Sequence, residues 1–263
     1  MKKIFIFGAL TIIATSCCQQ KNDVETENQN HLLLATAWYQ QSAEMRACYY
    51  QAYRMAQLAL TENLKNYKGD KRPAVVLDID ETVLDNSPFE AKMVADNTPY
   101  SDSLWHCWTN RACAIALPGA VEFINFAKQQ GVDVYFVSNR ADNERSTTLE
   151  NLSEVGMPTD SANLLTVAPG ESSCKDSRRA QVAETHEILL FVGDALGDYS
   201  SLFDRRNASL ALGVVDSLKA DFGTRFIILP NPMYGEWENA IYRSKSAKKR
   251  REKNKTLIDL FRI

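Results

Sequence analysis

The segment Val75–Asn86, VVLDIDETVLDN, leads an apolar run directly into a cluster of acidic side chains. The run is short and β-branched, which is typical of a buried strand. Four acids follow it within eight positions, namely Asp78, Asp80, Glu81 and Asp85. Carboxylates repel one another and are costly to bury without a partner. The pattern therefore fits one of two arrangements: the acids face water at a strand end, or a cation binds among them.

Further along the chain, short apolar runs alternate with stretches of helical composition. The runs are rich in β-branched or aromatic residues and have the length of strands: Ala74–Leu77, Val132–Val137, Leu164–Val167, Ile188–Val192 and Phe226–Leu229. Helices are expected between them at Gly119–Gln130, Asn143–Val155 and Ser177–Thr185. Apolar runs without polar alternation indicate a parallel sheet covered on both faces. We therefore predict an α/β fold with a doubly wound, Rossmann-like parallel sheet as its core.

Two further segments predict a smaller, mainly helical lobe. Residues 31–67 contain no proline or glycine and are rich in helix-forming residues, so one or two helices are expected. Residues 86–117 separate the first core strand from the second by more chain than a simple crossover needs. We expect this insertion to join the N-terminal helices in the smaller lobe, while residues 68–263 form the core domain that carries the acidic cluster.

The N-terminus has the pattern of an export signal. Two lysines precede an apolar run, Ile4–Ile13, that is too short to span a bilayer comfortably. Small residues and two cysteines follow, in an order that resembles the bacterial lipoprotein signal. We expect a signal peptide in residues 1–17, lipidation at Cys17 with Cys18 as the alternative, and a flexible tether in residues 18–30. A lipid would anchor the exported protein to the outer membrane, on either face, without a spanning helix.

The composition excludes some partners. The 263-residue chain has a formal net charge of −3, with 45% apolar and 24% charged residues, as in an ordinary soluble domain. Nothing in this balance points to a nucleic-acid polymer. The basic run Lys245–Lys255 is expected to be a solvated helix face, with contact to anionic lipid or substrate as the alternative. Four cysteines lack metal-type spacing and are expected to be buried small apolar side chains: Cys48, Cys107, Cys113 and Cys174.

Polar residues stand where predicted strands end or a predicted helix begins. In chain order the groups are Asp78-Ile79-Asp80-Glu81-Thr82, Ser138-Asn139-Arg140, Lys175, and Gly193-Asp194 with Asp198 four positions on. Because the carboxyl ends of parallel strands share one edge of a sheet, these groups are expected to meet there. Each group alone is weakly specific, but in this order they resemble the haloacid dehalogenase superfamily of phosphohydrolases.

Longer stretches narrow the resemblance to one group. The stretches VVLDIDETVLDNSP, LPGAVEFINFA, VYFVSNR, FVGDALGDY and LPNPMYGEWE are similar to class C non-specific acid phosphatases, which are bacterial lipoproteins. With the N-terminal AWYQQSAEMRACYYQAY, the resemblance covers residues 31–245. The chain departs from it at Ala195, Tyr199 and Phe89, where the family usually has Asn, Phe and Tyr. Ala195 removes one side-chain hydrogen bond near the expected metal site.

The resemblance implies a role for each acidic residue. Asp78 would be the nucleophile that forms an aspartyl-phosphate, and also a metal ligand. Asp80 would protonate the leaving alcohol and then activate water, while its backbone carbonyl binds the metal. Asp194 would complete the protein ligands, and Asp198 would hold a metal-bound water or Lys175.

The resemblance assigns other residues to phosphate binding. Ser138 and Asn139 would donate hydrogen bonds to phosphate oxygens, and Lys175 would offset charge in the transition state. Thr82 would steady the loop that carries Asp78. These residues come from separate strands and helices, so the assignment requires the fold predicted above.

The chemistry of phosphate esters explains why acids and a cation belong together. A phosphomonoester carries about two negative charges at pH 7, so it repels a carboxylate nucleophile such as Asp78. One Mg²⁺ per site, bound through oxygen ligands, would reverse that repulsion. Asp80 must be protonated when it acts as an acid, so we expect an acidic pH optimum.

Aromatic residues suggest a substrate class. Trp105 and Tyr234 are at the positions where the resemblance implies an aromatic clamp, although either could simply belong to the core. Flat aromatic pairs stack bases and nicotinamide rings. The expected activity is therefore that of an acid phosphatase or 5′-nucleotidase acting on nucleoside 5′-monophosphates, including nicotinamide mononucleotide.

Other functions stay open at this stage. The substrates could instead be sugar or aryl phosphates, and the protein could be a catalytically silent surface lipoprotein that binds a ligand. The presence of Asp78, Asp80, Lys175 and Asp194 argues against the silent alternative. The resemblance also implies a homodimer as one option, although nothing in the sequence marks an interface.

Overall fold

A computed structural model describes residues 30–158, 160–204 and 211–242. In these ranges no helix is both long and apolar enough to cross a bilayer. The expected signal peptide, Cys17, the tether up to residue 29 and the basic run Lys245–Lys255 lie outside the described residues.

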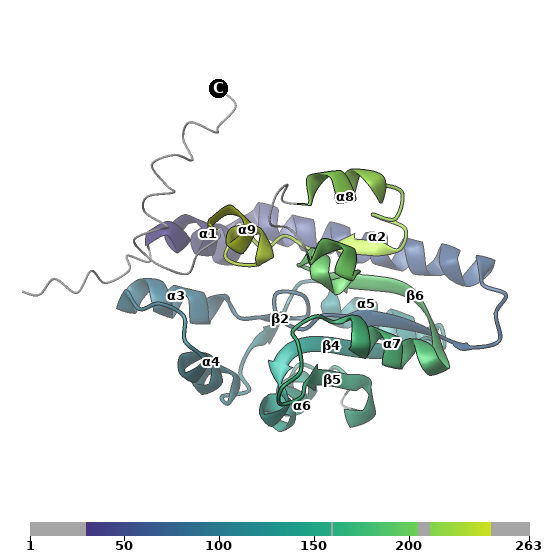
Figure 1. Ribbon diagram of the computed structural model, residues 1–263, viewed down its shortest axis with the longest axis horizontal. Coiled ribbons are helices and arrows are strands. Elements are labelled where there is room, and N and C mark those ends of the chain that lie inside the picture. Colours follow the sequence, from purple (N-terminus) through teal and green to yellow (C-terminus); the bar gives the residue numbers. More distant parts are fainter. Residues whose placement is uncertain (1–29, 159, 205–210, 243–263) are drawn as a thin grey trace, which may run out of the picture.

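A five-stranded sheet forms the centre of the molecule, with the strand order β5-β4-β1-β6-β7 (Figure 1). Every neighbouring pair is parallel. The strands are β1 (Arg72–Leu77), β4 (Asp133–Ala141), β5 (Leu164–Val167), β6 (His186–Gly193) and β7 (Phe226–Ile228). Each coincides with one of the five predicted runs, so the predicted doubly wound α/β fold is confirmed.

Helices cover both faces of this sheet, which explains why its strands are apolar throughout. All four residues of Ala74–Leu77 are buried, because successive side chains point to opposite faces and both faces are packed. One face packs mainly on α2 (Ala43–Asn66) and α5 (Ala120–Gln129), with Leu152 of α6 (Arg145–Glu154) beside them. The other packs on α7 (Asp176–Thr185) and α8 (Leu212–Ser217).

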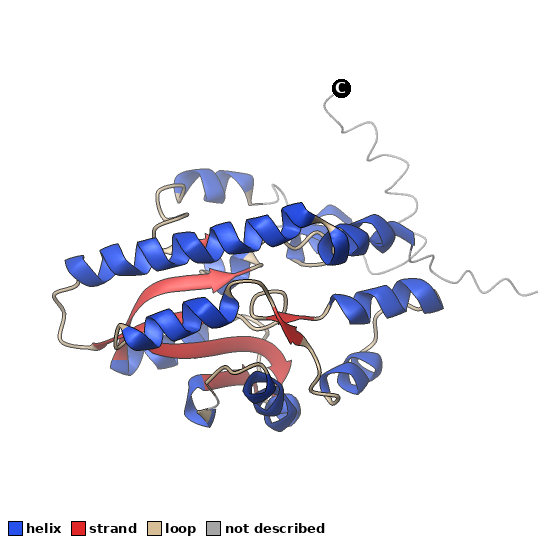
Figure 2. Cartoon of the chain, turned by 180° about the vertical axis from the view of Figure 1, so that it is seen from behind, coloured by secondary structure: helices blue, strands red, loops and turns tan. Residues whose placement is uncertain are grey.

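A smaller apolar cluster lies beyond the carboxyl ends of the strands. It joins α1 (Asn30–Gln41) to the predicted insertion, through Leu32, Phe89 and Met93 with Trp105 and Trp108 packed against them. In Figure 2 the arrowheads of the central strands point toward these helices. The insertion contains α3 (Ser87–Asp96), α4 (Asp102–Thr109) and β3 (Ile115–Ala116), which pairs with β2 (Leu84–Asp85). A last helix, α9 (Glu236–Tyr242), follows the core strands.

The two N-terminal helices pack on different parts of the molecule. Ser42 separates them, and its hydroxyl caps α2 by accepting a 3.0 Å hydrogen bond from the backbone N–H of Met45. Helix α1 contacts α3, whereas α2 contacts α5, β6 and β7. The division of the chain at residue 67 stays a prediction, but the long helix before it lies along the core sheet.

The prediction that the cysteines are buried is wrong. Cys48, Cys107 and Cys113 are exposed, Cys174 is half-buried, and all four carry free thiols. Three of them lie on amphipathic helices or next to one, where composition does not reveal which face is packed.

Candidate active site

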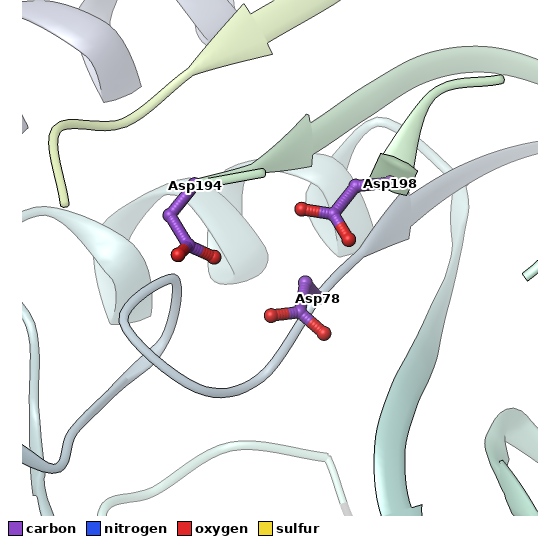
Figure 3. Close-up of side chains that lie close together, drawn as sticks. All are labelled: Asp78, Asp194 and Asp198. Atoms are coloured by element: carbon purple, nitrogen blue, oxygen red, sulfur yellow. The ribbon is translucent and has the colours of Figure 1, made fainter. Parts of the chain in front are cut away.

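Three aspartates meet at the carboxyl edge of the central strands. Asp78 directly follows β1, while Asp194 and Asp198 lie in the segment that follows β6. One oxygen of each lies within 4.8 Å of the others, and Figure 3 shows the three side chains together. The structure therefore brings together the three residues predicted to offer side-chain oxygens to the metal, from segments more than a hundred residues apart.

Lys175 places one positive charge against these three acids. Its buried ammonium donates a 2.7 Å hydrogen bond to Asp198 and another to Asp78. Burial alone would lower the pKa of Lys175, but the two carboxylates outweigh it and raise that pKa. The predicted Lys175 contact with Asp198 is thus present, and the lysine also reaches Asp78.

The acid cluster remains short of positive charge. Burial raises the pKa of Asp78 well above its usual value, and Asp198 and Asp194 add to this, while Lys175 opposes it. Burial raises the pKa of Asp194 to about 7, and the charge of Asp198 adds to the effect. Hard, closely spaced oxygen donors with excess negative charge are what a hard dication such as Mg²⁺ binds. The donor set therefore fits a divalent cation.

A tight loop after β1 fixes the direction of the acids. The carbonyl of Ile79 accepts backbone hydrogen bonds from Thr82, Val83 and Leu84, and Glu81 has a positive φ of 55°. A non-glycine residue in that region costs about 1–3 kcal/mol. The buried side chain of Glu81 spans the turn and accepts a 2.7 Å hydrogen bond from the backbone N–H of Asn86.

Helix α2 holds the same loop from the core side. The hydroxyls of Tyr49 and Tyr53 donate to the backbone carbonyls of Glu81 and Thr82. Thr82 in turn donates a 3.3 Å hydrogen bond to Asp194. Thr82, predicted to steady the Asp78 loop, thus connects that loop to Asp194, the acid directly after β6.

The carboxylate of Asp80 bonds to Arg140 and is not one of the three clustered acids. The guanidinium of Arg140 is buried, and its Nε and Nη2 lie 3.0 and 2.8 Å from one oxygen of Asp80. Asn86 donates a 2.8 Å hydrogen bond to that same oxygen. Arg140 also reaches Thr148 and lies over the ring of Trp105, 5.8 Å from its centroid. Asp80 therefore has a fixed position between the loop and the smaller lobe.

The predicted phosphate donors lie at the end of β4, next to β1. Leu77 is opposite Phe136 in the sheet, so Ser138 and Asn139 emerge at the same edge as Asp78. Ser138 accepts a 3.1 Å hydrogen bond from the N–H of Arg140, which leaves its hydroxyl hydrogen to donate elsewhere. Asn139 is exposed, and its oxygen accepts from Arg178, which turns its NH₂ toward other partners.

The two predicted clamp residues are both half-buried. Trp105 meets the ring of Phe89 edge-on, with centroids 5.3 Å apart, and Tyr234 packs against the core cluster. Each ring therefore combines packing with exposed surface. The clamp stays a prediction, since these contacts are equally those of partly buried core residues.

Several polar partners of the site were not predicted. Arg140 stood in the quoted motif without a role, and Arg178 lies three positions after Lys175. Asn86 follows the acid cluster, and Asn231 stands between two prolines in the LPNPMYG stretch, where its side chain donates to Asp194 at 2.9 Å. A polar residue between prolines in an otherwise apolar stretch was the one signal that could have marked Asn231.

Comparisons with known proteins identify the family and support the fold. The sequence model of the HAD superfamily, subfamily IIIB (acid phosphatase), matches residues 1–237. The crystal structure of a class C acid phosphatase from Bacillus anthracis with tungstate bound is 41% identical, with a TM-score of 0.83. That match covers 90% of this chain and 99% of the other. A further structure of the Bacillus anthracis protein matches with a TM-score of 0.81.

More distant relatives share part of the chain. Acid phosphatase 1 of Solanum lycopersicum is 24% identical over 63% of this chain, and the stem 31 kDa glycoprotein of Glycine max is 27% identical over 60%. The match spans only 60% and 58% of these two relatives. The predicted family resemblance is confirmed by the model match and the close structural match. From its sequence, its fold and its cluster of aspartates, the chain belongs to the HAD superfamily, subfamily IIIB, the family of acid phosphatases.

Proposed function

We propose that this protein hydrolyses phosphate monoesters with the help of a divalent cation, and that Asp78 is the nucleophile. The observation that carries this proposal is the meeting of Asp78, Asp194 and Asp198, of which Asp78 and Asp198 also bond to the ammonium of Lys175. The related Bacillus anthracis structure supports it, because the bound tungstate is a tetrahedral dianion, as a phosphate group is.

Asp78, Asp194 and Asp198 would hold the cation through carboxylate oxygens. When bound, Mg²⁺ would neutralise charge on the phosphoryl oxygens and so remove the repulsion between ester and nucleophile. Lys175 would remain beside Asp78 and offset the charge that grows on the phosphoryl group in the transition state.

The chain's own residues would then carry two transfers. In the first, an oxygen of Asp78 attacks phosphorus, the bond from phosphorus to the ester oxygen breaks, and Asp80 gives its proton to the departing alcohol. In the second, Asp80 takes a proton from water, the water oxygen attacks phosphorus, and Asp78 leaves as a carboxylate. Ser138 and Asn139 would donate hydrogen bonds to the phosphoryl oxygens at both stages.

The simplest test of this chemistry uses a generic ester. We expect the purified protein to release p-nitrophenol from p-nitrophenyl phosphate at acidic pH with Mg²⁺, and to lose that activity when a chelator removes the cation. A protein that merely binds ligands would turn over none of the ester under either condition. Undiminished turnover after chelation would contradict the role of the cation.

Nucleoside 5′-monophosphates, including nicotinamide mononucleotide, are the proposed substrate class. Trp105 supports this substrate class. The guanidinium of Arg140 contacts both the ring of Trp105 and the carboxylate of Asp80, so an aromatic side chain lies close to the proposed proton donor. Sugar or aryl phosphates are the alternative class. A kinetic comparison across a panel of phosphomonoesters separates the two, since a sugar gains nothing from stacking and the single ring of an aryl ester gains less than a purine base.

The substitution Trp105→Ala tests the aromatic contact. Stacking of a base on an aromatic side chain contributes about 1–3 kcal/mol, so the KM for adenosine monophosphate should rise roughly tenfold or more. The KM for p-nitrophenyl phosphate should change far less. Tyr50→Ala is the control, because that aromatic ring is exposed on α2, beside Arg46. Equal effects of Trp105→Ala on both esters would exclude the clamp.

A further inference from the structure

Asn231 joins the acid cluster from a loop that follows β7. The loop is tied to the end of β6, because the N–H of Leu229 donates a 2.9 Å hydrogen bond to the carbonyl of Gly193. Pro230 and Pro232 flank Asn231 and restrict its backbone. Its side-chain NH₂ lies 2.9 Å from Oδ2 of Asp194. A stiff loop thus delivers one neutral donor to a carboxylate of the cluster.

The orientation of the Asn231 amide follows from its other contacts. Its oxygen accepts hydrogen bonds from the backbone N–H groups of Met233, at 3.0 Å, and Tyr234, at 3.4 Å. A flipped amide would point its NH₂ at two N–H donors, which is unfavourable. The oxygen therefore closes the turn that carries Tyr234, and the NH₂ necessarily faces Asp194.

Asp194 depends on this contact more than on its other side-chain donor. Thr82 bonds to the second carboxylate oxygen at the longer distance of 3.3 Å. The neighbouring residue, Ala195, has no polar side chain to add a bond. Residues that hydrogen-bond to a metal ligand fix its direction, and their loss typically weakens metal binding about 10–100-fold.

We propose that Asn231 is a positioning residue that orients Asp194 for the divalent cation and couples the cation site to the turn carrying Tyr234. The inference rests on the proposed function in one respect, namely that a divalent cation binds at the acid cluster. It goes beyond that function because it makes the side-chain amide of Asn231 responsible both for the affinity of the site for the cation and for the position of Tyr234.

Two substitutions separate the two halves of the amide. In Asn231→Ser the hydroxyl can still accept from the turn's N–H groups, but it is too short to reach Asp194 as well. In Asn231→Ala both contacts are lost. Asn239→Ser is the matched control, because that asparagine is exposed on α9 and bonds only locally, to Glu236.

Isothermal titration calorimetry with Mg²⁺ gives a readout that does not depend on turnover. We expect Mg²⁺ to bind about 10–100-fold more weakly to both Asn231 variants than to the parent protein and the Asn239→Ser control. At saturating Mg²⁺, kcat for p-nitrophenyl phosphate should return to the parent's value in the serine variant. The KM for adenosine monophosphate should rise only in the alanine variant, because only there is the Tyr234 turn released.

Failure of the inference differs from failure of the proposed function. If the parent binds Mg²⁺ and Asn231→Ser binds it as tightly, Asn231 has no positioning role while the cation site stands. If the parent binds no Mg²⁺, both the inference and the proposed use of a cation are overturned. A serine variant whose lost activity saturating Mg²⁺ cannot restore would also contradict positioning through Asp194.

Discussion

At the scale of single residues, the two aspartates after β1 have different cationic partners. Lys175 bonds to Asp78, whereas Arg140 bonds to Asp80. Carboxylates two positions apart in one loop can have different roles when their surroundings differ. The structure supplies that difference, because Asp78 lies in the acid cluster and Asp80 is held by Arg140, whose guanidinium also lies over the ring of Trp105.

The substitution Arg140→Met tests whether this pairing serves the reaction. Without the guanidinium, Asp80 is no longer held in one place, and misplacement of a reacting group by about 1 Å can cost about 100-fold in rate. We expect kcat for p-nitrophenyl phosphate to fall by about that factor, with KM little changed. Arg140→Lys should fall nearly as far, because an ammonium cannot reproduce the two contacts of the guanidinium.

The control for this experiment is Arg145→Met, since Arg145 begins α6 and contacts Thr166, the Ser161 carbonyl and Asp142 rather than the aspartates of the site. Thermal melting of each variant shows whether the fold persists, because Arg140 is buried. Parent-like kcat in folded Arg140→Met and Arg140→Lys would show that Asp80 needs no such partner.

Single residues were predictable where strand ends determined their position. Asp78, Asp194 and Asp198 could be expected to meet because parallel strands end at one edge, whereas Lys175 was expected there from the family resemblance. Arg140 and Asn231 could not be given partners, because their contacts depend on how loops far apart in the chain fold back on the sheet. The distance between two side chains in such loops leaves no trace in local composition.

At the scale of elements, α3 carries a carboxylate that its position disfavours. Glu90 is buried in the smaller lobe, and burial raises its pKa to about 8, with the charge of Glu238 on α9 adding to the shift. The unfolded chain has a glutamate pKa of about 4.3. A raised folded pKa means that stability is fully present below that unfolded value and is lost as pH rises through the folded one.

The substitution Glu90→Gln should therefore flatten the pH dependence of folding. We expect the parent's free energy of unfolding to fall between about pH 4 and pH 8, by an amount on the order of a few kcal/mol from this group. The glutamine variant should lack that fall and be the more stable protein near pH 7. Urea unfolding across this range measures both, with the exposed Glu150→Gln as control. Parallel curves for parent and Glu90→Gln would contradict this explanation.

The sequence predicted the elements of the core better than those of the smaller lobe. Strands such as β5 (Leu164–Val167) matched because an apolar run bounded by polar residues has few other structures available. The two-residue strands β2 and β3 were not predicted, because so short a pairing has no periodicity. The sequence also left undecided whether residues 31–67 form one helix or two, since no proline or glycine marks the break at Ser42. The structure shows the break through the cap contact to Met45.

At the scale of the whole molecule, the acid cluster lies between the sheet and the helical lobe. Helices α3 and α4 lie beyond the ends of the strands, on the side where the acids emerge (Figure 1). An ester bound at Asp78 would therefore present its leaving group to residues of the lobe, such as Trp105. The specificity of the protein is expected to depend on the lobe, and its chemistry on the sheet.

The proposed membrane anchor is a separate property of the whole chain. We predict that Cys17→Ser, expressed with the full N-terminal segment in a bacterium that processes lipoproteins, moves the protein from the membrane fraction to the soluble fraction without lowering its phosphatase activity. Cys18→Ser tests the alternative site, and Cys48→Ser, at an exposed cysteine on α2, is the control. Membrane retention of a variant with both Cys17 and Cys18 replaced by serine would exclude a lipid on either residue.

The most direct test of the central claim is phosphate release from p-nitrophenyl phosphate by the parent and by Asp78→Asn, each with saturating Mg²⁺. The two side chains have nearly the same shape, so the variant should keep the fold while losing the attacking carboxylate. We predict that kcat falls by at least about a thousandfold, as expected when a nucleophile is removed. An Asp78→Asn protein that releases phosphate as fast as the parent would show that Asp78 does not attack the ester.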